Sequence, residues 1–171
     1  PQFRSSAASD VYKRQLFGMI TPSGLHFERH HQGWVDIDPR RHRLMINGLV
    51  ETPLVFTMEE LLRMPSVSRI HFLECGANTG LEWGNVAVPT VQYSHGMLSA
   101  SEFTGVPVSL LLERAGYDRK RATVLLAEGA DGSSMTRTIN LENALDDALV
   151  AFGQNGEMLR PENGYPLRLV V

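Results

Sequence analysis

The chain has only one cysteine, Cys75, among its 171 residues. One thiol cannot form an internal disulfide, so packing must stabilise the fold. No apolar run approaches the roughly 18 to 20 residues that span a bilayer, and we expect no membrane span. The formal net charge of −3 is not the basic excess typical of nucleic-acid-binding proteins, so we expect no nucleic-acid partner. These shortages favour an ordinary globular domain that works on small molecules or other proteins.

The two ends of the sequence differ from the rest. Residues 1–18 show no usable periodicity, and we interpret them as a non-native or disordered leader. The last residues, "YPLRLVV", predict a buried strand. Domains rarely end inside a core strand, because termini normally lie at the surface. We therefore expect residues 19–171 to be a partial domain, truncated on its C-terminal side.

Short strands and short helices alternate irregularly along the chain. Thr57 and Glu60 form a capping-box pattern at the start of one helix, Asn140 caps another, and Asn155-Gly156 predicts a hairpin turn. A segment from Gly76 to Gly105 has little periodicity and is predicted to be irregular. The predicted strands cover residues 43–50, 54–56, 68–74, 122–129, 135–139 and 149–159, and the predicted helices cover residues 57–64, 106–116 and 140–148. Without the long helices of β-α-β crossovers, this order predicts an α+β fold that is mixed and mainly β.

Cys75 lies where a predicted strand, "SRIHFLE", ends in a loop. A buried structural cysteine is the commonest reading of such a residue. Two observations favour a functional thiol: its position at the strand end, and the following Gly76 and Asn78, which tolerate positive φ and would let the backbone approach a ligand closely. A thiolate there could be a nucleophile or a metal ligand. A cysteine hydrolase or transferase remains open, with Cys75 activated by His30, His31 or His95.

Three further polar stretches are candidates for binding. "LHFERHH" places Arg29 beside His30 and His31, which would suit an anionic group, although a solvated loop is the simpler reading. "EGADGSS" follows "ATVLLAEG", which predicts a buried strand, and its Asp131-Gly132 pair predicts a turn. In "PENGYPLR", Arg168 lies within an apolar strand, where a charge usually has a dedicated anionic partner.

Taken in order, these stretches resemble one family. The series "FERHH", "FLECGAN", "TGVPVSLLLERAGY", "EGADGSS" and "NGYPLRLVV" is similar to the molybdopterin-binding domain of the sulfite oxidase family, from about residue 21 to the last residue. Within that family, "SHGMLSASEFTGVPVSLLLERAG" most resembles SoxC, the molybdenum subunit of bacterial sulfane or sulfite dehydrogenases. The resemblance implies a sulfite-oxidase-type fold and a molybdenum-molybdopterin cofactor.

The resemblance also implies roles for individual residues. Cys75 matches the cysteine whose thiolate binds molybdenum, and Arg29 matches a position near the oxyanion pocket. Asn163 stands where eukaryotic members often have histidine, and Thr79-Gly80 replace a sulfite-binding arginine of those enzymes, so the substrate pocket is expected to differ from theirs. The expected cofactor contacts are Phe27, Glu28, Arg29, His30, His31, Asp131, Asn163 and Arg168.

The activity that the resemblance implies is oxidation of a small sulfur substrate. Sulfite or protein-bound sulfane sulfur would accept an oxygen atom, and the electrons would pass to a c-type cytochrome subunit in the periplasm. A homodimer or a heterotetramer is expected for the full-length protein, whereas these 171 residues alone are expected to be inactive. Two alternatives stay open: the cysteine hydrolase or transferase described above, and a non-catalytic relative that keeps the fold.

Overall fold

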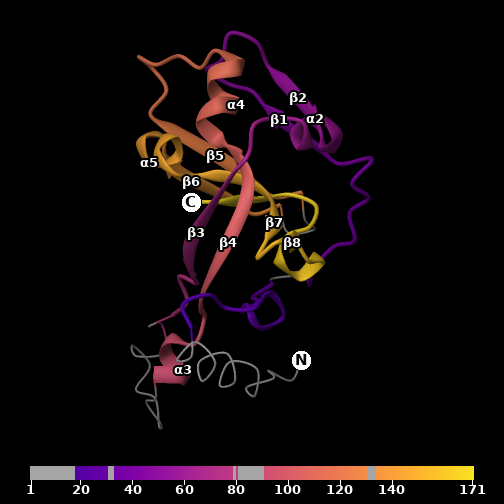
Figure 1. The fold of residues 1–171 in the computed structure, drawn as a ribbon. Coiled ribbons are helices and arrows are strands. Elements are labelled where there is room, and N and C mark those ends of the chain that lie inside the picture. Colours follow the sequence, from indigo (N-terminus) through magenta and orange to yellow (C-terminus); the bar gives the residue numbers. More distant parts are fainter. Residues whose placement is uncertain (1–17, 31–32, 79, 81–90, 131–133) are drawn as a thin grey trace. The chain divides into compact units, whose positions relative to one another are not determined.

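The computed structural model describes residues 18–30, 33–78, 80, 91–130 and 134–171 (Figure 1). The chain divides into two compact units. The first comprises Pro1–Arg29 and Ile70–Glu102, and the second comprises His30–Arg69 and Phe103–Val171. The predicted leader lies almost wholly outside the described residues.

Short elements follow one another through the described chain, most of them strands. In order they are η1 (Ser23–Leu25), β1 (Arg43–Ile46), β2 (Leu54–Thr57), α2 (Met58–Leu62), β3 (Val67–Glu74), α3 (Val91–His95), β4 (Leu98–Pro107), α4 (Val108–Ala115), β5 (Val124–Glu128), β6 (Thr136–Asn140), α5 (Leu141–Asp146), β7 (Leu149–Gln154), β8 (Glu157–Met158), η3 (Pro161–Asn163) and β9 (Arg168–Val170). This content confirms the predicted mixed, mainly β, α+β class.

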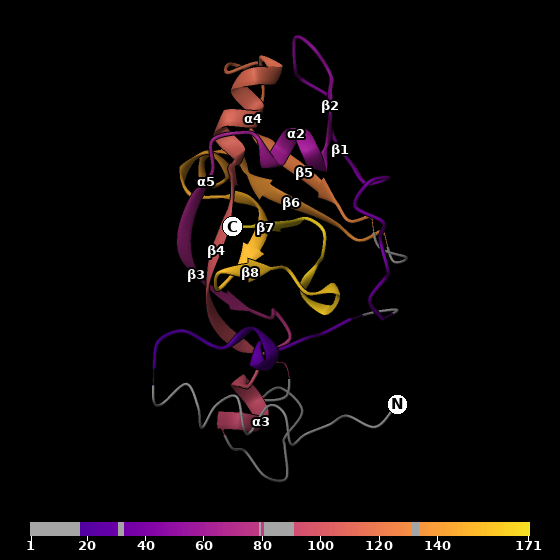
Figure 2. The same cartoon turned by 45° about the vertical axis from the view of Figure 1, so that its right-hand side comes forward.

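The largest sheet has the strand order β3-β4-β7-β8, and β9 also pairs with β7. β7 is antiparallel to β4, β8 and β9. Figure 2 shows β7 and β8 side by side, joined by the tight turn that the sequence predicts. Both turn residues have positive φ, 51° at Asn155 and 78° at Gly156, as a two-residue hairpin turn requires.

Two-stranded ribbons and capped helices complete the second unit. β1 pairs with β2, and β5 pairs with β6, both antiparallel. The predicted capping box is present: Glu60 N donates to Thr57 Oγ1 (3.2 Å), and Thr57 N donates to Glu60 Oε2 (2.7 Å). Asn140 Oδ1 likewise accepts from Glu142 N (3.1 Å). The predicted helix starts are therefore confirmed.

The hydrophobic core of the second unit gathers apolar side chains from α2, α4, α5, β4 and β7. Leu61 and Val106 are fully buried, and Leu111 is 1% exposed. Burying a side chain of this size contributes about 1.5–3 kcal/mol relative to leaving it exposed. The full set of buried members is Phe56, Met58, Leu61, Val106, Val108, Leu111, Leu112, Leu141, Ala144, Ala148 and Val150.

Two sequence predictions about these elements were wrong. The segment predicted to be irregular contains α3 and β4, a strand of ten residues. Three consecutive small residues of β4, Ser99, Ala100 and Ser101, are all buried, so apolar and polar residues do not alternate there. The strand predicted to be buried, β5, exposes Val124 (55%) and Leu126 (68%). It pairs with β6, and its side chains alternate: Leu125 packs against the core, whereas Val124 and Leu126 lie on the opposite, exposed face.

Gly105 lies at an irregularity in the pairing of β4 with β7. The register shifts between Thr104 and Gly105, leaving one residue of β7 unmatched. A Cβ at position 105 would overlap Val150 O and lie 2.5 Å from Ala151 Cα. Only glycine lets the two backbones approach this closely.

No helix of the described residues is long and apolar enough to cross a membrane.

We predict that Gly105→Ala lowers the free energy of unfolding by about 3 kcal/mol or more, because backbone atoms of β7 cannot move aside cheaply. Urea denaturation followed by circular dichroism measures the change. Gly18→Ala is the matched control: no atom lies within 4 Å of an added Cβ there, and the expected effect is within about 0.5 kcal/mol. Equal stability of the two variants would contradict this account of the bulge.

Candidate functional site

The segment Phe27–Arg29 lies after η1 in the first unit and is tied to β4. Phe27 N donates to Ser99 Oγ (3.1 Å), and Ser99 is fully buried. At the next residue of β4, Ala100 O accepts from Thr21 N (2.7 Å). The start of the segment is therefore held by strand hydrogen bonds, while Glu28 and Arg29 are exposed.

Arg29 is available for a ligand. No ion pair or hydrogen bond holds its guanidinium among the described residues. An exposed guanidinium presents several N–H donors in one plane, which match an oxyanion. Arg29 could thus bind an anionic group without first breaking an internal ion pair.

Cys75 follows β3 directly and is half-buried, with a free thiol. Its backbone N–H donates to Met97 O (3.0 Å), the residue before β4. At the other end of the same strand pair, Ser68 Oγ and Thr104 Oγ1 lie 2.7 Å apart. These two contacts show that β3 and β4 run in opposite directions. The strand pair therefore ends at the cysteine, as the sequence predicts.

The sequence analysis singled out Gly76 and Asn78 because both residue types tolerate positive φ. Neither Gly76 nor Asn78 is among the described residues with positive φ. An added Cβ at Gly76 would meet no protein atom within 4 Å. Asn78 is instead 5% exposed, and its side-chain amide hydrogen-bonds to Met97 and Glu74. The residue matters here for its amide group, which sequence reasoning missed.

The cysteine-hydrolase alternative requires a base beside the thiol. His95 Nδ1 lies 2.7 Å from Ser94 Oγ, and no histidine of the described residues hydrogen-bonds to Cys75 Sγ. His31 lies outside the described residues. The described part of the chain thus offers no activated Cys-His pair.

Arg168 is the most unusual charge of the second unit. Its Nη1 donates to Asn163 O (2.9 Å), and its guanidinium carbon lies 5.9 Å from the centre of the Phe103 ring. Burial lowers the pKa of Arg168 to about 10, and no carboxylate of the described residues acts against that shift. A partly buried guanidinium whose partners are a carbonyl and a ring lacks a counter-ion among the described residues.

The residues around Arg168 shape its surroundings. Asn163, 2% exposed, ends η3, and Gly164 follows with φ of 104°. A Cβ at Gly164 would lie 3.2 Å from Arg168 Cβ. The turn therefore brings its backbone close to the arginine.

The structure brings together some of the predicted site residues. Phe27–Arg29 and Cys75 belong to the first unit, and both segments bond to β4 or the residue before it, at Ser99 and Met97. Asn163 and Arg168 touch in the second unit, where His30 also lies. His31 and Asp131 lie outside the described residues. The Ser99 and Met97 contacts were not predicted, because "SHGMLSAS" has no strand periodicity.

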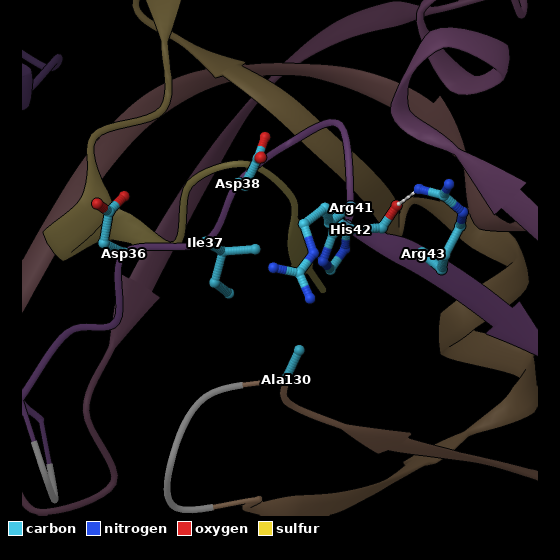
Figure 3. A pocket seen from close by; sticks show the side chains of 7 residues that line it. All are labelled: Asp36, Ile37, Asp38, Arg41, His42, Arg43 and Ala130. Carbon is cyan, nitrogen blue, oxygen red and sulfur yellow. Dashed lines mark hydrogen bonds between the residues drawn. The ribbon is translucent and has the colours of Figure 1, made fainter.

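A separate pocket of about 470 Å³ lies in the second unit (Figure 3). The side chains of Ile37 and Arg41 extend toward Ala130, whereas Arg43 turns back and donates to His42 O (2.7 Å). Burial, with the charge of Arg43, lowers the pKa of His42, which favours the neutral imidazole. The lining residues are Asp36, Ile37, Asp38, Arg41, His42, Arg43 and Ala130, none of which the sequence predicted as a site residue. In sequence, the pocket borders Asp131.

Metal binding through several protein side chains finds no support in the part of the chain described. No group of three or more His, Cys, Asp or Glu side chains is arranged there to hold a metal ion. A single thiolate ligand needs no such group.

Comparisons with known proteins agree on one family. Residues 31–171 match the family described as "Oxidoreductase molybdopterin binding domain". The NADH nitrate reductases of Ulva prolifera and Brassica napus are 31% and 36% identical over 95% and 90% of this chain. The chain spans about a fifth of the length of these curated relatives, 20% and 18% respectively.

A solved structure is also similar. The crystal structure of the sulfane dehydrogenase SoxCD from Paracoccus pantotrophus superimposes with a TM-score of 0.84 and is 51% identical in sequence. The match covers 90% of this chain and 39% of that chain.

We predict that pyrophosphate stabilises the wild-type chain but not Arg168→Met, because the anion supplies the missing counter-charge. At a ligand concentration of ten times Kd, binding contributes about 1.4 kcal/mol. That corresponds to a rise in Tm of about 3–6 °C, measurable by differential scanning fluorimetry.

The matched control is Arg137→Met, since exposed Arg137 also donates to a backbone carbonyl, Thr136 O (2.8 Å). This variant should keep the full rise in Tm. An equal rise in wild type and Arg168→Met would show that the anion binds elsewhere.

Proposed function

Because this chain belongs to the oxidoreductase molybdopterin binding domain family, we propose that it is the cofactor-binding part of a dehydrogenase that oxidises sulfite or sulfane sulfur. The cofactor of the family is molybdenum-molybdopterin. Two features of the structure fit that group. Cys75 offers a free thiol at the end of a strand, and Arg168 is a partly buried cation without a carboxylate partner among the described residues.

Cys75 is proposed as the protein ligand of molybdenum. Its backbone is held by the bond to Met97 O (3.0 Å), while its sulfur makes no hydrogen bond within the described residues. The sulfur is thus free to bind a metal without losing a protein partner. Metal coordination would also remove the thiol proton, because the thiolate is the ligand.

Arg168 and Asn163 are proposed to hold the phosphate-bearing part of the cofactor, with His31 and Asp131 as further contacts. Burying the Arg168 charge is unfavourable unless an anion accompanies it. A phosphate would accept a charge-assisted hydrogen bond from the guanidinium, which is roughly twice as strong as a neutral one. The same phosphate would restore the pKa of Arg168 toward its ordinary value.

Phe27, Glu28 and His30 are proposed to complete the cofactor contacts beside Arg29. Phe27 carries the hydrogen bond to Ser99 that fixes the segment. Its ring stacks on His26, with ring centroids 5.2 Å apart. The stacked pair stiffens the segment, so that the neighbouring polar groups would meet a planar ligand in one arrangement.

Arg29 is proposed to bind the sulfur oxyanion. When bound, the molybdenum cofactor supplies two-electron oxygen-atom transfer to sulfur. With sulfite, the overall change is sulfite plus water to sulfate, two protons and two electrons. The guanidinium of Arg29 would orient the anion and stabilise its charge as the sulfate forms. The two electrons would leave singly to a c-type cytochrome subunit.

The choice of a sulfur substrate rests on the degree of similarity. Identity to the sulfane dehydrogenase is 51%, against 31–36% for the nitrate reductases of Ulva prolifera and Brassica napus. The proposal extends to a periplasmic location and to assembly of the complete protein as a homodimer or a heterotetramer with its cytochrome.

We predict that the complete, cofactor-loaded protein reduces oxidised cytochrome c with sulfite or an organic persulfide, and that it does not reduce nitrate with a reduced dye. Arg29→Gln should raise KM for the sulfur anion by about 10- to 100-fold, the loss expected for one charged hydrogen bond. Initial rates at varied substrate concentration give both answers.

Arg63→Gln serves as the matched control. Arg63 is an exposed arginine whose ion pair with Glu59 (2.6 Å) lies on α2, and exposed pairs contribute little. KM should stay unchanged in this variant. Nitrate reduction without sulfur oxidation would overturn the proposed substrate class, and an unchanged KM in Arg29→Gln would overturn the role of Arg29.

A further inference from the structure

Next to Cys75, the side chain of Asn78 makes the last hydrogen bonds of the strand pair β3–β4. In an antiparallel ladder every second pair of opposite residues is a hydrogen-bonded pair, in which the two residues exchange both backbone hydrogen bonds. Here Cys75 N donates to Met97 O (3.0 Å), but Cys75 O accepts from Asn78 N (2.9 Å) instead of from Met97 N. Because the turn after Cys75 uses Cys75 O as the acceptor for Asn78 N, this carbonyl does not accept from Met97 N.

The Asn78 side chain takes the place of that carbonyl. Met97 N donates to Asn78 Oδ1 (3.2 Å), and Asn78 Nδ2 donates to Met97 O (2.9 Å). Because a backbone N–H can only donate, the atom facing Met97 N must be the amide oxygen. The amide therefore pairs with Met97 as another backbone residue would, in both directions.

A third bond ties Asn78 to the end of β3. Asn78 Nδ2 also donates to Glu74 Oε1 (3.1 Å), the residue before the cysteine. Asn78 is 5% exposed, so water can replace these bonds only poorly. The Asn78 side chain thus bonds to Glu74, the residue before Cys75, and to Met97, the residue opposite Cys75.

Asparagine is the residue type that this arrangement requires. Aspartate could accept from Met97 N but could not donate to Met97 O, and it would place a second carboxylate beside Glu74. Serine is shorter by one bond and has one proton to donate. Alanine would leave the partly buried Met97 N–H without its acceptor.

We propose that Asn78 is a positioning residue that holds the Cys75 backbone in one conformation against Met97, so that the thiolate is presented to the metal in a fixed direction. This inference rests on the proposed role of Cys75 as the molybdenum ligand. The same stretch of β4 also receives Phe27 N at Ser99 Oγ (3.1 Å), two residues beyond Met97. Loosening Met97 would therefore disturb the segment that carries Arg29 as well.

Cofactor-free chain allows the positioning to be measured without activity. Amide hydrogen exchange at Met97 should become about tenfold faster or more in Asn78→Ala, because Met97 N–H loses its acceptor, Asn78 Oδ1. Exchange at Cys75 should rise as well, because its acceptor, Met97 O, is no longer held by Asn78 Nδ2. Cys75 is the sole cysteine of the chain, so alkylation by iodoacetamide reports on this thiol alone. Its rate should rise severalfold in the same variant.

Asn140→Ala is the matched control. It also removes an asparagine side chain that hydrogen-bonds to backbone, at Glu142 N (3.1 Å), but in the second unit. It should leave exchange at Cys75 and Met97, and the alkylation rate, at their wild-type values. Should Asn78→Ala fail to fold, Asn78→Ser provides the same comparison with a smaller change in polarity.

The complete, cofactor-loaded protein gives a second readout. The electron paramagnetic resonance spectrum of Mo(V) depends on the direction of the thiolate ligand, so Asn78→Ala should shift or broaden it, whereas Asn140→Ala should not. A variant that only loses stability would give a weaker Mo(V) signal with the same line shape and position.

Two results would overturn the inference: wild-type exchange at Cys75 and Met97 in Asn78→Ala, or faster exchange spread equally over β5 and β6. Absence of molybdenum from the complete wild-type protein would instead overturn the proposed function, and it would leave the exchange result standing. The two ideas can therefore fail separately.

Discussion

Hydrogen bonds to one short stretch of the chain, residues 97–100, hold both predicted site segments of the first unit. Met97 O receives the amide of Cys75, and Ser99 Oγ receives the amide of Phe27. Ser99 and Ala100 are buried, so these bonds are shielded from water and are costly to break. A rigid strand thus fixes the backbone of a thiol and the start of a cationic segment, while Cys75 Sγ and the Arg29 guanidinium stay free for a ligand. Functional groups on rigid elements are held more precisely than groups on loops.

The second unit contains a cation, Arg168, that has no anionic partner among the described residues. Removal of its guanidinium from water lowers the pKa of Arg168 to about 10. Such a cation destabilises the fold at every pH below that value, because the unfolded chain carries the charge in water at no such cost. Binding of an anionic cofactor would offset this penalty. Part of the cofactor's binding energy would thus appear as folding stability.

Much of the fold could be predicted from local patterns, and the failures have identifiable causes. The capping box at Thr57, the cap at Asn140 and the Asn155-Gly156 turn follow from side-chain chemistry within a few residues, and all are present. β4 was missed because its buried residues are small and do not alternate in polarity. The exposure of β5 depends on which strands flank it, and that is a tertiary property.

The sequence predicted which residues belong to the candidate site better than it predicted why they matter. Arg168 was expected to need an anionic partner, and the structure supplies the reason, a partly buried charge whose partners are a carbonyl and a ring. Asn78 was expected to matter for backbone freedom, whereas its amide in fact completes a strand pair. A bond between residues 19 positions apart in the chain leaves no local pattern to read, so only the folded structure could reveal it.

The molybdenum content of the complete protein, with and without Cys75→Ser, tests the central claim most directly. Elemental analysis should find about one molybdenum per wild-type chain, and X-ray absorption should show one sulfur neighbour fewer, or no metal at all, in Cys75→Ser. A Cys75→Ser protein with the metal content and sulfur coordination of wild type would contradict the account. The thiol of Cys75 would then be structural, and another group would hold the metal.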